Sequence, residues 1–184
     1  MEKNGGRVLS EIPVMRLLFF STILVVGTAI YTPSRSAELL PAHAIVDSIV
    51  IIKQKRELFV YQKHQLLKIY RIALGAQPKG AKQYKGDMRT PEGMYFINGK
   101  NPKSTCHKSL GISYPSVKDR EYAQSIGKDP GGDIKIHGLP NGQGYIGAAH
   151  TLKDWTWGCI AITDEEIDEL YDHVKVGASV NILP

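Results

Sequence analysis

The sequence is poor in the features that mark several protein classes. Its six histidines form neither a His-x-His nor a His-Glu-x-x-His pattern, and only His107, His137, His150 and Cys159 remain as candidates for convergence on one metal ion. A catalytic zinc needs three protein ligands in a defined geometry, so we expect no metal and no other cofactor. A formal charge of +5 is too small to indicate a nucleic-acid-binding protein. No internal repeat or low-complexity tract is present, so the length allows one ordinary domain and a targeting segment.

Long apolar runs are also scarce, and the only one lies near the N-terminus. It extends over residues 17–31, about 15 residues, and follows Lys3, Arg7 and Arg16. That length is typical of the apolar region of a signal peptide and is short for a membrane span. We therefore expect residues 1–44 to be a signal peptide, cleaved after Ser36 or Ala44, or an uncleaved membrane anchor. Either alternative predicts an exported protein of the periplasm or cell envelope, with membrane contact only through this segment.

The remaining sequence predicts a mostly β domain over residues 45–184. β-prone runs separated by short polar links indicate strands at 48–52, 57–61 and 66–74, with further strands at 94–97, 110–114, 134–136 and 178–182. One helix is expected after Thr163, which forms a capping box with Glu166. Its apolar positions follow helical spacing through Val174, and Gly177 is its expected C-terminal stop.

Cysteine is rare as well, with two in the chain. In an oxidising compartment one alternative is a disulfide between Cys106 and Cys159. A bridged Cys159 would lose its reactivity, however, and Cys106 is more simply interpreted as a small apolar filler on a strand. Cys159 follows Gly158, and the pair His137-Gly138 precedes it. A thiol, an imidazole base and backbone amides are the groups that cysteine acyl transfer needs. We therefore predict Cys159 as nucleophile and His137 as base, with His137 as the positive partner of a Cys159 thiolate.

These residues resemble the signature of the L,D-transpeptidase catalytic domain, the YkuD-like family. The matching positions are His137, Thr156, Gly158, Cys159 and Ile160. Trp157 stands where the family usually has His, and Ala161 stands where it has Arg or Asn, as in a subgroup that reads Asp-Trp-Thr-x-Gly-Cys-Ile-Ala. The segments at 86–93 and 109–115 agree too, so the resemblance extends roughly from residue 47 to 184. It implies a β-sandwich with few helices.

The resemblance also implies a role for each site residue. The carbonyl of Gly138 would orient the ring of His137, with Asp133 as an alternative orienter. The oxyanion would be held by the backbone amides of Trp157, Gly158 and Cys159. Contacts with substrate are expected from Thr156, Trp157, Tyr114 and His107.

By the same resemblance, the substrates are the stem peptides of peptidoglycan. Cys159 would attack the L,D-linked carbonyl before a terminal D-Ala, and an amine of a second stem would complete a 3→3 crosslink. Water as acceptor would make the protein an L,D-carboxypeptidase, and an amine on an envelope protein would make it an anchoring enzyme. Carbapenem-type β-lactams are the expected covalent inhibitors. A non-catalytic module that binds peptidoglycan is the alternative from another functional class.

Overall fold

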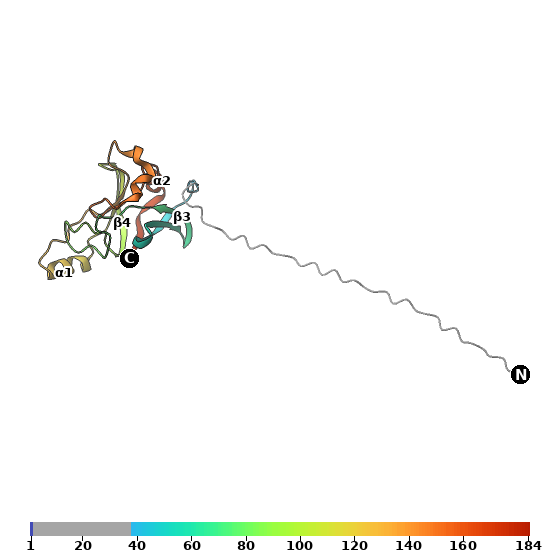
Figure 1. Ribbon diagram of the computed structural model, residues 1–184, viewed down its shortest axis with the longest axis horizontal. Coiled ribbons are helices and arrows are strands. Elements are labelled where there is room, and N and C mark those ends of the chain that lie inside the picture. The colour runs from blue at the N-terminus through green and yellow to red at the C-terminus, as the bar shows by residue number, and fades with distance from the viewer. Residues whose placement is uncertain (2–37) are drawn as a thin grey trace. The chain divides into compact units, whose positions relative to one another are not determined.

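The computed structural model describes Met1 and residues 38–184 (Figure 1). The predicted apolar segment at 17–31 lies outside the described residues. Within residues 38–184, no helix has the length and apolar character needed to cross a membrane.

Eight strands form one sheet in the order β3-β2-β1-β8-β4-β5-β6-β7. Neighbouring strands are antiparallel, except that β1 and β8 are parallel and so are β6 and β7. The strands are β1 (Val46–Ile52), β2 (Glu57–Gln62), β3 (Gln65–Arg71), β4 (Gly93–Ser104), β5 (His107–Ile112), β6 (Lys135–His137), β7 (Ile160–Ala161) and β8 (Val174–Leu183). The mostly β prediction is confirmed.

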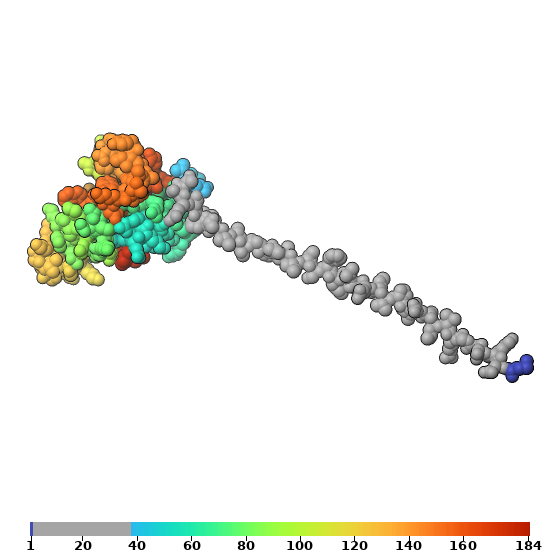
Figure 2. All heavy atoms as spheres, viewed as in Figure 1, coloured from blue at the N-terminus to red at the C-terminus, as the bar shows by residue number. Residues whose placement is uncertain are grey.

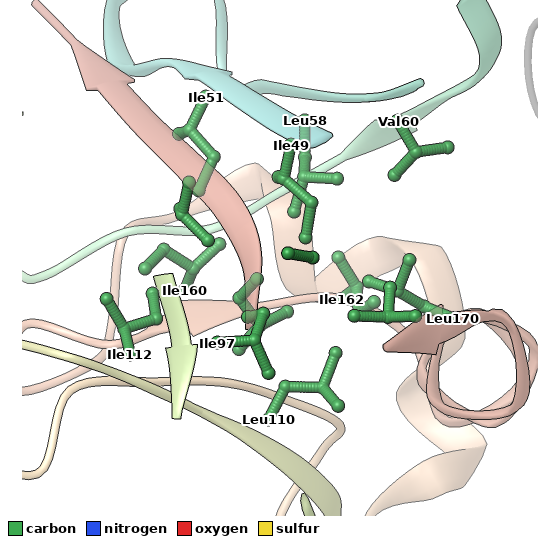
Figure 3. Close-up of a cluster of buried hydrophobic side chains, with 14 of the residues drawn as sticks. Ile49, Ile51, Leu58, Val60, Ile97, Leu110, Ile112, Ile160, Ile162 and Leu170 are labelled. Atoms are coloured by element: carbon green, nitrogen blue, oxygen red, sulfur yellow. The ribbon is translucent and has the colours of Figure 1, made fainter. Parts of the chain in front are cut away.

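The sheet changes direction along β4, which is its longest strand. The first part of β4, from Gly93 to Phe96, pairs with β8, and the part from Ile97 onward pairs with β5, with register shifts after Ile97 and after Asn101 in the pairing with β5. Such irregularities bend a strand and let one sheet curl over its own inner face. Figure 3 shows the result: side chains from β1 and β2, such as Ile49 and Leu58, face side chains such as Leu110 of β5 across a common core.

Helix α2 (Asp164–His173) begins at the predicted residue. Thr163 Oγ1 accepts from the Glu166 amide, and the Glu166 carboxylate accepts from the Thr163 amide, which completes the capping box. Ile167 and Leu170 are fully buried. The prediction of Gly177 as the helix stop is wrong, because the helix ends at His173 and Gly177 lies inside β8 with φ at +90°.

Sequence reasoning missed helix α1 (Val117–Ser125), which lies far from α2 in Figure 1. It has one fully buried side chain, Ala123, so its sequence lacks the apolar stripe that indicates an amphipathic helix. Its signal is the capping box of Ser116 and Asp119. Two 3₁₀ segments, Lys53–Lys55 and Gly144–Leu152, complete the regular structure of the described residues.

The described N-terminal residues pack against the domain. Leu40 and Ala44 are buried members of the core, whereas Leu39 is 77% exposed. The Leu40 amide donates to Glu169, whose other carboxylate oxygen accepts from Lys68 and Tyr70. The packed structure therefore begins before the first strand and includes residues that precede position 45.

Candidate active site

The parallel pairing of β6 with β7 places Cys159 and His137, the predicted nucleophile and base, on the same face of neighbouring segments. Ile136 pairs with Ile160 and His137 with Ala161. Side chains alternate along a strand, so the two buried isoleucines face the core while His137 faces the other side. Cys159 directly precedes β7, and the same alternation places its side chain on the face of His137.

The His137 ring is buried and its tautomer follows from its contacts. Nδ1 lies 2.7 Å from the Gly138 carbonyl oxygen, which only accepts, so Nδ1 carries the proton and Nε2 keeps its lone pair. Gly138 has no room for a side chain, because a Cβ atom would lie 2.5 Å from the Asp164 carboxylate. Asp133 does not orient the ring, because its carboxylate pairs with Lys135. The geometry thus matches the arrangement expected from Gly138.

The Cys159 thiol is hydrogen-bonded to backbone groups. Its Sγ lies 3.6 Å from the Asp133 carbonyl oxygen, to which it donates, and it is also hydrogen-bonded by the Lys135 amide. Burial raises the pKa of Cys159 above its ordinary value, and burial lowers the pKa of His137 despite the hydrogen bond to Gly138. The structure therefore favours a neutral thiol and a neutral imidazole at pH 7, where the sequence suggested a thiolate–imidazolium pair. Desolvation, which penalises both charges, is the reason.

The loop before Cys159 is shaped by Thr156. Its buried Oγ1 donates to the Cys159 carbonyl at 2.7 Å and accepts from the Gly158 amide at 3.1 Å. The Gly158 amide is therefore occupied, which leaves Trp157 and Cys159 from the three predicted oxyanion donors. Gly158 has φ at +121°, and a Cβ atom there would lie 2.6 Å from the Arg89 carbonyl oxygen. Only glycine fits this close crossing of two chain segments.

Asp154 anchors this loop, and sequence reasoning assigned it no role. Arg56 binds both of its carboxylate oxygens, with a shortest distance of 2.7 Å, and the Leu74 amide donates to Oδ1. Such two-point pairs hold a fixed geometry. The only sequence signal was the position of Asp154 in the Asp-Trp-Thr run, because its partners lie about 80 and 98 residues earlier in the chain.

The predicted substrate contacts fall in different settings. Trp157 is 75% exposed beside the nucleophile. Tyr114 is buried, and its hydroxyl donates to the Pro130 carbonyl. It therefore holds the segment that leads to Asp133. His107 Nε2 lies 2.7 Å from Asp168, which also pairs with Lys108. Substrate contact by these residues stays a prediction, since Tyr114 and His107 are engaged within the protein.

Both cysteines are free thiols in this structure. Cys106 lies in the turn between β4 and β5, not on a strand as predicted, because β4 ends at Ser104 and β5 begins at His107. Within residues 38–184, no three side chains of His, Cys, Asp or Glu are grouped as a metal site.

Known proteins share both the sequence pattern and the fold. The model of the L,D-transpeptidase catalytic domain family, YkuD, matches residues 45–182. This chain belongs to the L,D-transpeptidase catalytic domain family. The protein named Putative L,D-transpeptidase YafK, of Escherichia coli (strain K12), is 31% identical over 132 residues, or 68% of this chain and 46% of its own length. The chain thus spans about half the length of the relatives it matches.

Solved L,D-transpeptidase-like structures share the fold. The helical cell shape determining protein Pgp2 from Campylobacter jejuni superposes with a TM-score of 0.56 at 24% identity, covering 81% of this chain and 51% of that one. An L,D-transpeptidase from Mycobacterium smegmatis gives a TM-score of 0.51 at 15% identity, with 74% and 58% covered. The expected fold class, a mostly β, L,D-transpeptidase-like domain with few helices, is therefore confirmed.

Proposed function

We propose that this protein is a cysteine L,D-transpeptidase that acts on peptidoglycan stem peptides through an acyl-enzyme on Cys159. One observation carries the proposal: His137 is held by Gly138 in the tautomer that leaves Nε2 free, on the strand face to which Cys159 also belongs. Family membership supports the same assignment.

The neutral pair implies general-base attack. As the Cys159 thiol leaves the Asp133 carbonyl, its proton passes to His137 Nε2 and the sulfur attacks the carbonyl before the terminal D-Ala. The amides of Trp157 and Cys159 face the developing oxyanion. Collapse breaks the C–N bond, His137 protonates the departing amine, and a thioester remains. The incoming amine then gives its proton to His137, attacks the thioester, and releases the thiol, which takes that proton back.

The acceptor decides the biological product. An amine of a second stem gives a 3→3 crosslink, and we favour this acceptor because YafK is named as a transpeptidase. Water or an envelope-protein amine would use the same acylation step. The name of Pgp2 links a protein of this fold to cell shape, so a role in cell-wall biogenesis in the periplasm or envelope forms part of the proposal, as does export through residues 1–44.

Covalent labelling tests the proposal. The intact protein is incubated with a carbapenem, and its mass is measured. One adduct on the wild type and on Cys106→Ala, with none on Cys159→Ala, is the expected result. The Cys106→Ala variant is the matched control, since both residues are half-buried free thiols.

Stem-peptide turnover completes the test. Release of D-Ala from a tetrapeptide and formation of crosslinked dimer are followed by mass spectrometry. Turnover by Cys159→Ala, or a wild type that neither acylates nor turns over, would contradict the proposed function and would leave the peptidoglycan-binding module as the better account.

A further inference from the structure

The peptide group that joins Gly138 to Leu139 is hydrogen-bonded on both of its sides. Its carbonyl oxygen accepts from His137 Nδ1 at 2.7 Å, and its N–H donates to Oδ1 of Asp164, also at 2.7 Å. The two bonds share one rigid unit, because the C=O of one residue and the N–H of the next lie in the same peptide plane. The proposed acylation step uses the first of these bonds only.

The fold brings Asp164 to this peptide group by way of the backbone. Asp164 is the first residue of α2, and the capping box of that helix fixes where the helix begins. Just before it, the Ile162 amide donates to the His137 carbonyl at 3.0 Å. The chain that leaves β7 therefore runs beside the end of β6, and it delivers a carboxylate that is 21% exposed to the Leu139 amide.

Two glycines make room for the Asp164 carboxylate. A Cβ atom on Gly138 would lie 2.5 Å from Oδ1, and one on Gly144 would overlap Oδ2. Gly144 begins the 3₁₀ segment Gly144–Leu152, which forms the orange group of atoms at the surface of the domain in Figure 2. Protein interiors do not relax freely around such overlaps, so a side chain at either glycine would displace the carboxylate. The slot between the two glycines thus fixes the position of Asp164.

A carboxylate in this position acts on the base through the peptide group. A hydrogen bond to an ionised acceptor is stronger than one between neutral groups, and hydrogen bonds in a chain polarise one another. The bond to Asp164 therefore makes the Gly138 carbonyl a better acceptor and fixes its direction. In a Ser-His-Asp triad the carboxylate binds the imidazole directly, holds its tautomer and stabilises the imidazolium that forms. Here one peptide group lies between the carboxylate and the imidazole of His137.

We propose that Asp164 is a positioning residue for the base: through the Gly138–Leu139 peptide it holds His137 in the Nδ1–H tautomer and stabilises the imidazolium formed during acyl transfer. The proposal assigns Asp164 no contact with substrate. It deepens the proposed function and rests on it, because it assumes that His137 Nε2 takes the thiol proton.

The other contacts around Asp164 and His137 agree with this role. Asp164 Oδ2 lies 3.9 Å from Nδ1 of His107, whose Nε2 is paired with Asp168 at 2.7 Å. The Leu139 amide is thus a nearer partner of Asp164 than the His107 ring is. The hydrogen bond to Gly138 acts to raise the pKa of His137, against the larger effect of burial. A firmer Gly138 carbonyl would offset more of the cost of charging the buried ring.

A spectroscopic experiment tests the link without any turnover. Long-range ¹⁵N–¹H spectra of the full-length protein at pH 7.5 distinguish protonated from unprotonated ring nitrogens, and His137→Gln assigns the His137 signals. In Asp164→Ala a share of the Nε2–H tautomer should appear, and the Nδ1 proton signal should move upfield as its hydrogen bond weakens. Asp164→Asn, whose side-chain oxygen can still accept from Leu139, should stay close to the wild type. Identical His137 signals in Asp164→Ala and the wild type would overturn the proposal.

A kinetic experiment adds the consequence for the reaction. The rate constant of acylation by a carbapenem should fall at least about tenfold in Asp164→Ala, because small displacements of a catalytic group are costly. Asp164→Asn should stay within about threefold of the wild type. Glu165→Ala is the matched control, because this exposed neighbour carries the same charge in the same first turn of α2. An equal loss in Glu165→Ala would assign the effect to the helix terminus and overturn the proposal.

A second variant keeps the test decisive if Asp164→Ala does not fold. Gly144→Ala retains Asp164 and its charge but places a Cβ atom against Oδ2. It should change the His137 signals and lower the acylation rate in the same direction as Asp164→Ala. Gly99→Ala is its control, because a Cβ atom there meets nothing within 4 Å. Circular dichroism confirms that each variant is folded, and wild-type signals and rate in a folded Gly144→Ala would contradict the proposal.

The failures of the two proposals are distinguishable. Unchanged His137 signals and a full acylation rate in Asp164→Ala, in a protein whose wild type acylates, would overturn the role of Asp164 alone. A changed tautomer in Asp164→Ala, in a protein that never acylates, would overturn the proposed function while the link between Asp164 and His137 stood.

Discussion

Two segments flank the nucleophile loop, and they treat buried polar groups in opposite ways. Residues 75–93, the supporting segment, pack against the loop that precedes Cys159. The Ala76 amide donates to the Thr156 carbonyl, and the Arg89 carbonyl contacts Gly158. Buried polar groups there are paired, as in Lys82 with Asp87 at 2.8 Å. The segment from 139 to 157 instead carries the unpaired nitrogens of His150 and Trp155.

The two segments therefore differ in how their buried polar groups contribute to the stability of the fold. A saturated hydrogen-bond network rigidifies its surroundings, and any loss from it destabilises the fold. Unpaired buried groups instead cost their desolvation penalty and lower the stability of the fold. Changes in the first segment should therefore lower stability, and changes on the side of His137 should lower activity.

The largest expected effect is on activity. His137→Ala removes the proposed acceptor of the thiol proton, and general acid–base help is worth about 10²–10⁴-fold. Acyl transfer to a stem peptide should fall at least about 100-fold, and circular dichroism confirms that the variant, which loses a buried ring, is folded. Rates are measured from pH 5.5 to 8.5. Because burial lowers the pKa of His137, the wild type should keep its base neutral, and its rate high, below the ordinary histidine pKa of about 6.5. A sharp fall of the rate at that value would favour the ion pair instead.

Substitutions in residues 75–93 should lower the free energy of unfolding. Asp87→Asn leaves the Lys82 ammonium buried without its counter-charge, which typically costs about 3 kcal/mol. Chemical denaturation measures the loss. Asp133→Asn is the matched control, because its ion pair with Lys135 is exposed on the carboxylate side and should cost under about 1 kcal/mol. Equal losses in the two variants would remove the contrast.

Asp87 should also make the stability of the fold depend on pH in the acid range. Burial alone would raise the pKa of Asp87, but hydrogen bonds from Gln83, Lys82, Arg89 and Tyr84 outweigh it and lower the value. A carboxyl whose folded pKa is depressed stabilises the fold above its unfolded pKa of about 3.9. That stability is lost as the pH falls through the lower folded value, and Asp87→Asn should lack this acid-dependent contribution.

The N-terminal boundary gives a smaller effect with an internal control. Leu40→Ala should cost about 2 kcal/mol, since the side chain is buried in the core. Leu39→Ala, one residue earlier and exposed, should be near neutral. Removing residues up to position 44 should then cost more than removing those up to 37, as measured by thermal unfolding. Equal stability of the two shortened proteins would place the domain boundary at 45.

The smallest expected effect is a change of slope with pH. A histidine whose folded pKa is lowered binds its proton less readily than in the unfolded chain, so stability falls as the pH drops from about 6.5 to about 4. His150→Leu should flatten part of this fall, and His137, whose pKa is lowered too, should account for another part. A slope identical in His150→Leu and wild type would contradict the burial of a neutral His150.

Sequence patterns predicted the helices and strands whose signals lie within a few neighbouring residues of the chain. The capping box at Thr163 set the start of α2, and alternating apolar residues located most strands, including the one that ends at His137. Pattern reading failed where neighbours in space decide the outcome. Lys82 lies in loop-like sequence among other lysines, a setting typical of a solvated surface, yet it is buried against Asp87. Gly177 is a residue type that commonly ends a helix, yet α2 ends earlier, where Val174 enters the pairing of β1 with β8.

The candidate site divides in the same way. The Gly158-Cys159 and His137-Gly138 pairs can be read from the sequence, because thiol and imidazole chemistry belongs to the residues themselves. The protonation states could not be read, since desolvation depends on what surrounds the two groups. Trp155 and His150 gave no chemical signal along the chain, because an unpaired nitrogen is defined only by the absence of partners in space.

The sequence by itself therefore determined the chemistry available to this protein: a thiol, an imidazole, a capped helix after them and β-prone runs around them. Tertiary structure decided how that chemistry is arranged. The parallel pairing of β6 with β7 places Cys159 beside His137, the contact of Gly158 with Arg89 bends the loop, and burial keeps both reactive groups neutral. The physical reason is that reactivity types are local properties of side chains, whereas distance, burial and unmet hydrogen bonds arise only when distant segments pack together.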